Sequence, residues 1–199
     1  KRQVILKGRT ELSEEEKQQL GLPVFVKPAR GGSSIGVSKV TTWEEFPTAV
    51  DLALEDDEKI LVEPEIVGQE VEIGVLHYAD GTLLASVPAL LAGIDDSDEG
   101  FYGFDTKYLD NVVTAEIPAP FAPELTEKLR DMAIRAFEAL NCEGLSRVDF
   151  FVTEESVYIN EINTLPGFTP ISMYPQVLAA SGVEYPALLE ALIEQALAK

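Results

Sequence analysis

The chain has 199 residues, of which 46% are hydrophobic and 25% are charged, and its formal net charge is −20. A chain of this length can bury a core without disulfides, and no apolar run approaches the roughly 20 residues that span a bilayer. The acidic balance argues against nucleic acids and membrane surfaces as partners. Cysteine and histidine occur once each, as Cys142 and His77, so no site uses paired residues of either kind. These features indicate a reducing, cytoplasmic compartment.

The predicted elements are short strands interspersed with a few helices. Hydrophobic patterns predict strands at 4–6, 24–27, 37–40 and 60–63, then at 70–76 and 82–87, and finally at 146–152 and 157–163. Capping boxes predict that helices begin near Ser13 and Thr42, the second ending near Leu54. Helical periodicity predicts further helices over 126–140 and 187–198. Strands in hairpins with helices to one side are typical of an α+β protein.

The hairpin over 146–163 carries the strongest local signal. Side chains alternate along a strand, so a three-residue turn at 154–156 would gather six residues on one face: Arg147, Asp149 and Phe151 from the first strand, and Ile159, Glu161 and Asn163 from the second. Asp149 would then lie opposite Glu161, which destabilises a sheet unless a cation is shared. Two carboxylates and an amide oxygen suit Mg²⁺. The alternative interpretation is a strand face whose charges simply face water.

Lys27 ends a predicted strand and is followed by a segment with three glycines and two serines, residues 31–36. Glycines let backbone N–H groups approach an anion closely, and a lysine in an apolar strand needs a counter-charge. The segment is neither a Walker A loop nor a dinucleotide fingerprint. A phosphate site is therefore one interpretation, and an ordinary turn is the other.

The segment 93–111 is long, acidic and aromatic. Long connections are usually functional or disordered. One interpretation is a lid that closes over a reacting phosphate and delivers Lys107; the alternative is a flexible surface loop.

Several motifs together resemble D-alanine–D-alanine ligases. They are Lys27-Pro-Ala-Arg-Gly-Gly-Ser-Ser-Ile-Gly-Val, Leu61-Val-Glu-Pro, Gly68-Gln-Glu-Val-Glu, Thr106-Lys-Tyr, Gly144-Leu-Ser-Arg-Val-Asp-Phe-Phe and Asn160-Glu-Ile-Asn-Thr-Leu-Pro-Gly-Phe-Thr. The resemblance runs in order from about Val4 to Ala198. It implies the ATP-grasp fold, in which two α+β lobes with mostly antiparallel sheets hold a nucleotide, here residues 1–66 and 67–199. It also implies ATP-dependent joining of two D-alanines for peptidoglycan synthesis.

The resemblance also implies roles for individual residues. Those expected at ATP are Lys27 at the α- and β-phosphates, Ser33 and Ser34 in the phosphate loop, Glu63 and Ile66 near the adenine, Glu70 near the ribose, Phe151 on the adenine and Lys107 at the γ-phosphate. Those expected at two Mg²⁺ ions, with Mn²⁺ as an alternative, are Asp149, Glu161 and Asn163. Those expected in catalysis and at the amino acids are Ser33 near the first D-alanine, Tyr108 beside Lys107, Arg147 and the Gly167 backbone for the tetrahedral intermediate, and Ser172 for the second D-alanine.

The family's N-terminal domain, which binds the first D-alanine, has no counterpart in these 199 residues. We therefore expect the chain alone to bind ATP but to ligate poorly, whereas full-length members are expected to be homodimers. Two other functions stay open. One is a related ligase that uses D-lactate or D-serine, which Tyr108 beside Lys107 disfavours. The other is a nucleotide-binding module without ligase activity.

Overall fold

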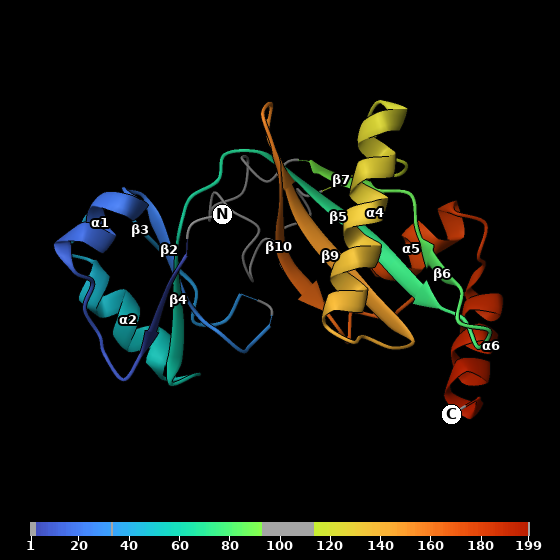
Figure 1. Cartoon of the computed structure of the whole chain (residues 1–199), viewed down its shortest axis with the longest axis horizontal. Helices are drawn as coiled ribbons and strands as arrows, with labels where there is room; N and C mark the ends of the chain where they lie inside the picture. Colours follow the sequence, from blue (N-terminus) through green and yellow to red (C-terminus); the bar gives the residue numbers. More distant parts are fainter. Residues whose placement is uncertain (1–2, 33, 93–113, 199) are drawn as a thin grey trace. The chain divides into compact units, whose positions relative to one another are not determined.

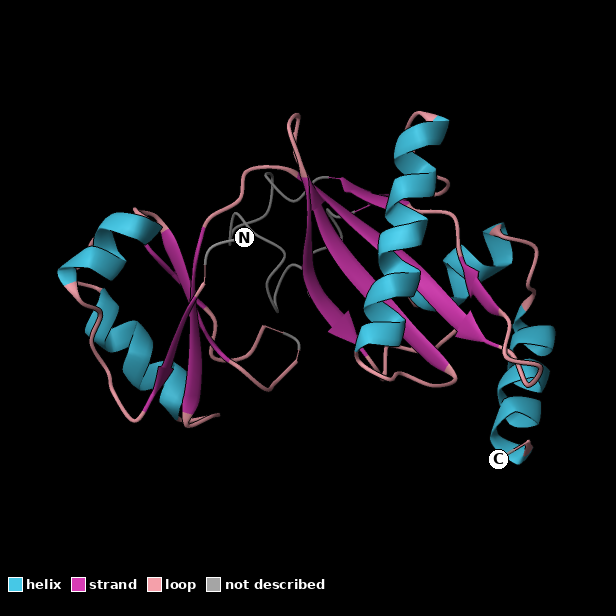
Figure 2. Ribbon diagram, in the orientation of Figure 1, coloured by secondary structure: helices cyan, strands magenta, loops and turns pink. Residues whose placement is uncertain are grey.

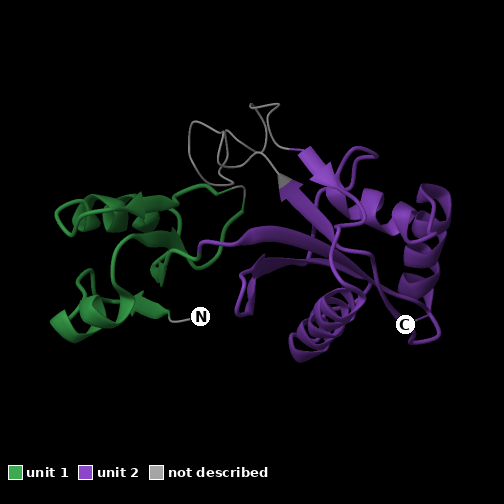
Figure 3. Cartoon of the chain, turned by 90° about the horizontal axis from the view of Figure 1, so that it is seen from above, with its two compact units in different colours: residues 1–66, 93–113 green, residues 67–92, 114–199 purple. Residues whose placement is uncertain are grey.

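The computed structural model describes residues 3–198 except residue 33 and residues 93–113. These residues form two compact units, one built from residues 3–66 and the other from residues 67–92 and 114–198 (Figure 3). Each unit has its own sheet and its own helices (Figure 2). No helix in the described part of the chain is long and apolar enough to cross a membrane.

Unit 1 contains a four-stranded antiparallel sheet in the order β1-β4-β2-β3. Its elements are β1 (Val4–Lys7), α1 (Glu14–Leu20), β2 (Val24–Pro28), β3 (Ser38–Val40), α2 (Phe46–Leu54) and β4 (Lys59–Pro64) (Figure 1). Alternate residues of the strands pack with both helices in one core, which includes Leu6, Val26, Val62, Leu20 and Val50. The strand residues between them, such as Lys27 and Glu63, therefore point to the opposite face.

Of the two helix starts predicted in unit 1, one is confirmed and one is wrong. Ser13 and Glu16 form the predicted capping box at α1. The prediction that a helix begins near Thr42 is wrong, because α2 begins four residues later, at Phe46. The Glu45 carboxylate does accept hydrogen bonds from the backbone N–H groups of Thr41 and Thr42. Glu45 thus stabilises a turn that leads into the helix.

Unit 2 contains a six-stranded antiparallel sheet in the order β10-β9-β5-β7-β8, with β6 paired to β5. Its strands are β5 (Gln69–His77), β6 (Leu83–Ala85), β7 (Ala89–Ala92), β8 (Thr114–Glu116), β9 (Leu145–Val152) and β10 (Val157–Asn163). Its helices are α4 (Pro123–Ala139), α5 (Met173–Ala180) and α6 (Tyr185–Leu197). The sequence did not predict β7, β8 or α5. The α+β architecture with antiparallel sheets is confirmed.

The two faces of the unit 2 sheet have different partners. Helix α4 packs through Leu129, Ala133 and Phe137 against alternate strand residues that include Val71 and Val148. Helix α5 packs on the other face through Tyr174 and Leu178, together with α6. Polar residues of β5, β9 and β10, such as Glu72, Arg147 and Glu161, share the face on which α5 packs. They lie on the part of this face near β9 and β10.

Gly74 allows α5 to approach β5 closely. A Cβ atom at this position would lie 2.5 Å from Leu178 Cδ2 and 3.1 Å from the Tyr174 ring. The Tyr174 hydroxyl donates a hydrogen bond to the Val75 carbonyl at 3.0 Å, which ties the helix to the strand. Because Gly74 is the cross-strand partner of Arg147, this contact brings the start of α5 to the sheet face that carries Arg147.

Candidate functional site

The polar face of unit 2 is built by three adjacent strands. The register places Asp149 of β9 opposite Glu72 of β5 on one side and opposite Glu161 of β10 on the other. Arg147 lies opposite Asn163. Cross-strand partners share a face, so the side chains that the sequence predicted to gather do gather, and Glu72 joins them.

The predicted turn of the hairpin is wrong, although the predicted pairing is right. Val157 pairs with Val152, so the connection has four residues, 153–156, where three were expected. A shift of register between Ile159 and Glu161 then restores the pairing of Glu161 with Asp149. This β-bulge at Asn160 also moves Ile159 to the other face. Ile159 packs against the α4 core. The prediction that Ile159 shares the face of Glu161 is therefore wrong.

Asp149 is the centre of the hydrogen bonds on this face. Arg147 donates to both carboxylate oxygens of Asp149, from Nε to Oδ1 at 2.7 Å and from Nη2 to Oδ2 at 2.7 Å. Asn163 Nδ2 donates to the same Oδ2 at 2.9 Å. Glu72 Oε2 lies 3.2 Å from Arg147 Nε. Arg147 is therefore held between two carboxylates on neighbouring strands.

The surroundings of Arg147 keep it firmly charged. Burial acts to lower the pKa of Arg147, but the hydrogen bonds that Arg147 donates to Asp149 and the negative charges of Asp149, Glu72 and Glu161 outweigh it, so the pKa is raised above its ordinary value. On this face the described strands β5, β9 and β10 contribute one arginine against the four carboxylates of Glu70, Glu72, Asp149 and Glu161. The surplus of negative charge favours a cation on this face.

The oxygen ligands on this face are of the kind that a hard cation binds, but Asp149 and Asn163 are hydrogen-bonded to each other and the described carboxylates are not arranged to hold a metal ion. Asp149, Glu161 and Asn163 offer the carboxylate and amide oxygens that Mg²⁺ prefers. Among the described residues, however, no group of three or more His, Cys, Asp or Glu is arranged to hold a metal ion. Arg147 and Asn163 engage three of the roughly four lone-pair sites of the Asp149 carboxylate. A cation would bind at the site left on Oδ1 or at one that Asp149 frees by giving up part of this hydrogen bonding.

Gly167 and Ser172 lie together in the segment that leads into α5. A Cβ atom at Gly167 would lie 3.0 Å from Ser172 Oγ. Ser172 Oγ accepts a hydrogen bond from the Thr169 N–H at 3.1 Å and lies 2.8 Å from Thr169 Oγ1. The segment is fixed to the fold by Phe168, whose carbonyl accepts from the Tyr185 hydroxyl. The structure thus brings together Gly167, which is expected at the tetrahedral intermediate, and Ser172, which is expected at the second D-alanine.

Glu70 and Phe151 are also neighbours, as cross-strand partners of β5 and β9. The same face therefore carries, along β9, the residues expected at the nucleotide base and ribose and then those expected at the metal. Two residues separate Phe151 from Asp149 and Glu70 from Glu72, which is one repeat of the strand.

In unit 1, Lys27 is paired with Glu63. Lys27 Nζ lies 2.9 Å from Glu63 Oε2, and their side chains are 19% and 5% exposed. Gln3 Nε2 donates to the other oxygen, Glu63 Oε1, at 2.6 Å. The charge on Lys27 that the sequence left without a partner is balanced here by a carboxylate. Ile66 lies at the end of this unit and is partly buried.

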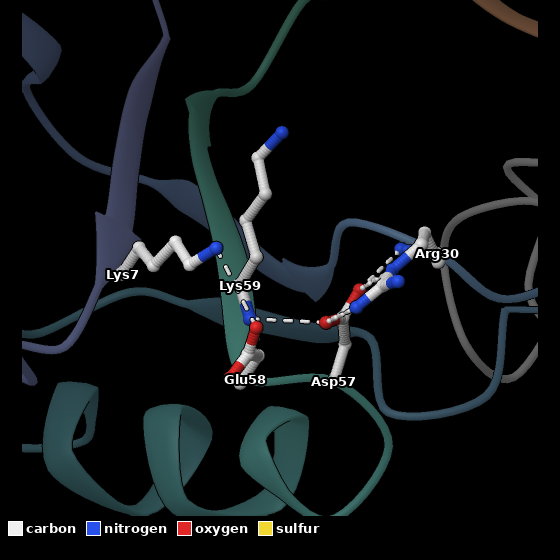
Figure 4. A network of polar contacts seen from close by, with 5 residues as sticks. All are labelled: Lys7, Arg30, Asp57, Glu58 and Lys59. Carbon is white, nitrogen blue, oxygen red and sulfur yellow. Dashed lines mark hydrogen bonds and ion pairs between the residues drawn. The ribbon is translucent and has the colours of Figure 1, made fainter.

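The glycine-rich loop is attached to the fold at its start and passes close to Asp56 at its end. The Arg30 backbone N–H and Nε donate to Asp57 Oδ2, at 2.9 Å and 3.0 Å, and Nη2 donates to Oδ1 at 2.8 Å (Figure 4). Asp57 also accepts from the Lys59 N–H, and its pKa is lowered, chiefly by the hydrogen bonds from Arg30. At the other end, a Cβ atom at Gly36 would lie 2.6 Å from Asp56 Oδ2.

The loop itself contains an unusual backbone conformation. Ser34 has a φ of 57°, in the left-handed region that few residues other than glycine adopt, and Gly36 has a φ of 70°. Such strain is typical of functional loops whose backbone is fixed by its surroundings. Ser33, Lys107 and Tyr108 lie outside the described residues.

Sequence reasoning missed Glu72, Arg30 and Asp57. Glu72 had a usable signal, because it follows Glu70 by two residues and so shares its face in a strand. The Arg30–Asp57 contact joins residues 27 positions apart, and no local pattern predicts it.

Comparisons with known proteins identify the family of the chain. The family model described as the D-ala D-ala ligase C-terminus matches residues 1–194. A D-alanine--D-alanine ligase of Corynebacterium efficiens is 65% identical over 98% of this chain and 54% of its own length. The chain therefore spans about half the length of this relative.

Two solved structures are similar over 98% of the chain. The VanG D-Ala:D-Ser ligase of Enterococcus faecalis has a TM-score of 0.81 at 32% identity, and 56% of it is covered. A D-alanine--D-alanine ligase of Bacillus anthracis complexed with ATP has a TM-score of 0.79 at 26% identity, and 60% of it is covered. The match of the family model over nearly all residues shows that this chain belongs to the D-alanine–D-alanine ligase C-terminus family, with the ATP-grasp fold.

Proposed function

We propose that the chain forms the nucleotide- and metal-binding part of an enzyme that uses ATP to join two D-alanines for peptidoglycan synthesis. The observation that carries this proposal is the polar face of unit 2, where Arg147, Asp149, Glu161 and Asn163 lie together. Residues 1–66 would serve as the smaller ATP-grasp lobe and residues 67–199 as the larger one. The enzyme would act in the cytoplasm as a homodimer.

In the first step, a carboxylate oxygen of one D-alanine attacks the γ-phosphorus of ATP. The bond to the β-phosphate oxygen breaks, and ADP leaves with the bonding electron pair, so an acyl phosphate forms. Lys27 and the backbone around Ser33 and Ser34 would hold the phosphates, and Lys107 would neutralise the γ-phosphate. Mg²⁺ or Mn²⁺, held by Asp149, Glu161 and Asn163, would supply further positive charge during the transfer. Two such ions are proposed.

The base and ribose would be bound by the remaining nucleotide residues. Glu63 and Ile66 would lie at the adenine, with Phe151 packed on its face, and Glu70 would accept a hydrogen bond from a ribose hydroxyl. The cross-strand pairing of Glu70 with Phe151 supports this assignment, since it places a flat apolar ring beside a hydrogen-bond acceptor.

In the second step, the amine of the other D-alanine attacks the acyl carbon. The tetrahedral intermediate expels inorganic phosphate, and the nitrogen loses a proton. Arg147 and the Gly167 N–H would stabilise the oxyanion. The Ser172 hydroxyl already accepts from Thr169, so its own hydrogen can be donated to the carboxylate of the second D-alanine. Ser33 and Tyr108 would position the first.

Two other functions remain candidates. The similarity to VanG, which is named a D-Ala:D-Ser ligase, supports D-serine as a second substrate, and D-lactate is chemically related. Coverage of about half of the relatives supports a chain that binds nucleotide without ligating on its own.

The test separates binding from ligation. Calorimetry should detect binding of AMP-PNP, a non-hydrolysable ATP analogue, in the presence of Mg²⁺, with no binding when EDTA removes the metal. Dipeptide formation is then measured by mass spectrometry for the chain alone and for the chain fused to the N-terminal part of the Corynebacterium efficiens relative. D-Alanine, D-serine and D-lactate compete in equal amounts. Failure of the chain to bind the nucleotide would refute the proposal, and a mixed ester or D-alanyl-D-serine product would favour the alternative.

A further inference from the structure

Arg147 and a divalent cation compete for the negative charge of Asp149. Both oxygens of Asp149 accept hydrogen bonds from Arg147 at 2.7 Å, and Oδ2 also accepts one from Asn163. If Asp149 is to ligate a divalent cation, as the proposed function requires, the cation and the guanidinium repel each other across one carboxylate, which favours opening part of this bidentate contact. The guanidinium of Arg147 then needs another anchor, because it is 16% exposed and an unpaired charge at such a depth is costly.

Glu72 is placed to be that anchor. Its side chain is 4% exposed, and Oε2 lies 3.2 Å from Arg147 Nε, on the side of β9 opposite to Glu161. Its backbone position is fixed, because β5 lies between β9 and β7 in the sheet. Gly74, two residues further on, is locked under α5. Glu72 therefore offers a fixed negative charge on the edge of the polar face that is remote from Glu161.

We propose that Glu72 is a positioning residue for Arg147, which it holds in place when Asp149 exchanges its hydrogen bonds to Arg147 for a divalent cation. This inference rests on the proposed function. The arrangement of the strands supports it: Arg147 can stay paired with Glu72 of β5, while Asp149 and Glu161, which lie opposite each other on β9 and β10, receive the cation. Glu72 thereby makes the release of Asp149 less costly and keeps Arg147 over the reacting carbonyl.

The first test is a double-mutant cycle on metal affinity. Binding of Mn²⁺ in the presence of AMP-PNP is measured by electron paramagnetic resonance for the chain, for Glu72→Gln, for Arg147→Met and for the double variant. Glu72→Gln should weaken Mn²⁺ binding about tenfold, as changes in the partners of metal ligands do. In the Arg147→Met background the same change should weaken it about threefold or less, because only the direct charge effect remains. Equal losses in both backgrounds would overturn the inference.

The second test observes the guanidinium directly. The Nε–H resonance of Arg147 is assigned by its loss in Arg147→Met and followed by NMR as Mg²⁺ and AMP-PNP are added. In the chain it should shift and stay protected from exchange with water, whereas in Glu72→Gln it should broaden or vanish on addition. A resonance that stays protected in Glu72→Gln would overturn the inference.

A matched control removes a carboxylate that also pairs with an arginine but lies away from this face. Glu127 is exposed and 2.7 Å from Arg130 Nη1 on α4, so Glu127→Gln should leave Mn²⁺ affinity and the Arg147 resonance unchanged. If the unaltered chain binds neither Mn²⁺ nor AMP-PNP, the proposed function fails and the inference fails with it. If the chain binds both and the cycle shows no coupling, only the role of Glu72 fails.

Discussion

The two units use similar pairs of charged residues, but the pair in unit 1 is neutral and the cluster in unit 2 is negative. In unit 1, Lys27 meets Glu63, so cation and carboxylate cancel. In unit 2, Arg147 meets Asp149 and Glu72, with Glu161 on the next strand, so the described side chains leave a surplus of negative charge. Under the proposed function, strand register would prepare one sheet for an anion and the other for a cation. A phosphate would take the place of Glu63 beside Lys27, whereas a divalent cation would neutralise the surplus on unit 2.

The largest expected effect comes from reducing that surplus. Asp149→Asn removes a charged ligand and the bidentate partner of Arg147, so Mn²⁺ binding should weaken by about 100-fold or more, the upper end of what changes near metal ligands cost. Titration calorimetry with Mn²⁺ and AMP-PNP measures this, and Glu127→Gln is the control. Unchanged affinity would mean that the two units do not differ in the ligands they attract.

The next effect tests whether the polar face depends on the packing behind it. Gly74→Ala would place a methyl group 2.5 Å from Leu178 Cδ2, and overpacking of this kind costs about 1–3 kcal/mol. Urea denaturation followed by far-UV circular dichroism should show a lower stability. Leu178→Ala should cost less in the Gly74→Ala background than alone, because it removes the clash. Strict additivity of the two changes would contradict the packing argument.

A smaller effect is expected from the loop anchor in unit 1. Asp57→Asn removes the charge that Arg30 contacts with three hydrogen bonds, so the loop should occupy its binding conformation less often. Apparent affinity falls with that fraction, and we expect about fivefold weaker binding of AMP-PNP with Mg²⁺. Glu58→Gln alters the exposed contact with Lys7 at 3.5 Å and a weaker charge interaction with Arg30, but it keeps the hydrogen bonds between Arg30 and Asp57. It is the matched control and should leave the affinity nearly unchanged.

The smallest effect concerns an exposed pair that serves stability alone. Hydrogen bonds from Arg9 and from the Ser13 backbone lower the pKa of Glu16 to about 2. A lowered carboxyl pKa stabilises the fold above the unfolded value, near 4.5, and this stabilisation is lost as the pH falls towards 2. Glu16→Gln should therefore cost about 0.5–1 kcal/mol at pH 7 and clearly less at pH 3, as urea denaturation at both values would show. An equal cost at both values would contradict the assignment.

Much of the site could be predicted because it follows from the period of a strand. The alternation of residues 147–151 placed Arg147 and Asp149 on one face, and the partner strand supplied Glu161 and Asn163. The family resemblance, confirmed by the match over residues 1–194, supplied the fold. The roles of individual residues stay predictions until binding is measured.

The remaining features depend on contacts that no local pattern encodes. Helix α5 has eight residues and little amphipathic periodicity, so it forms because Tyr174 and Leu178 pack on β5 at Gly74. The Arg30–Asp57 contact needs the chain to return after 27 residues. The bulge in β10 compensates for one extra residue in the turn. The sequence predicted a turn that is one residue too short and placed Ile159 on the wrong face. These two errors cancel at Glu161, which pairs with Asp149 as predicted.

That bulge shifts by one residue which side chains of β10 face the core. On its turn side, Val157 and Ile159 face the core in step with Val152 and Phe150, whereas beyond it Ile162 takes over the core and Glu161 faces outward. The positions of Glu161 and Asn163 opposite Asp149 and Arg147 therefore do not depend on the length of the turn alone. Homologous hairpins could gain or lose a turn residue without misplacing the acids, provided that the bulge is lost or gained in the same evolutionary step.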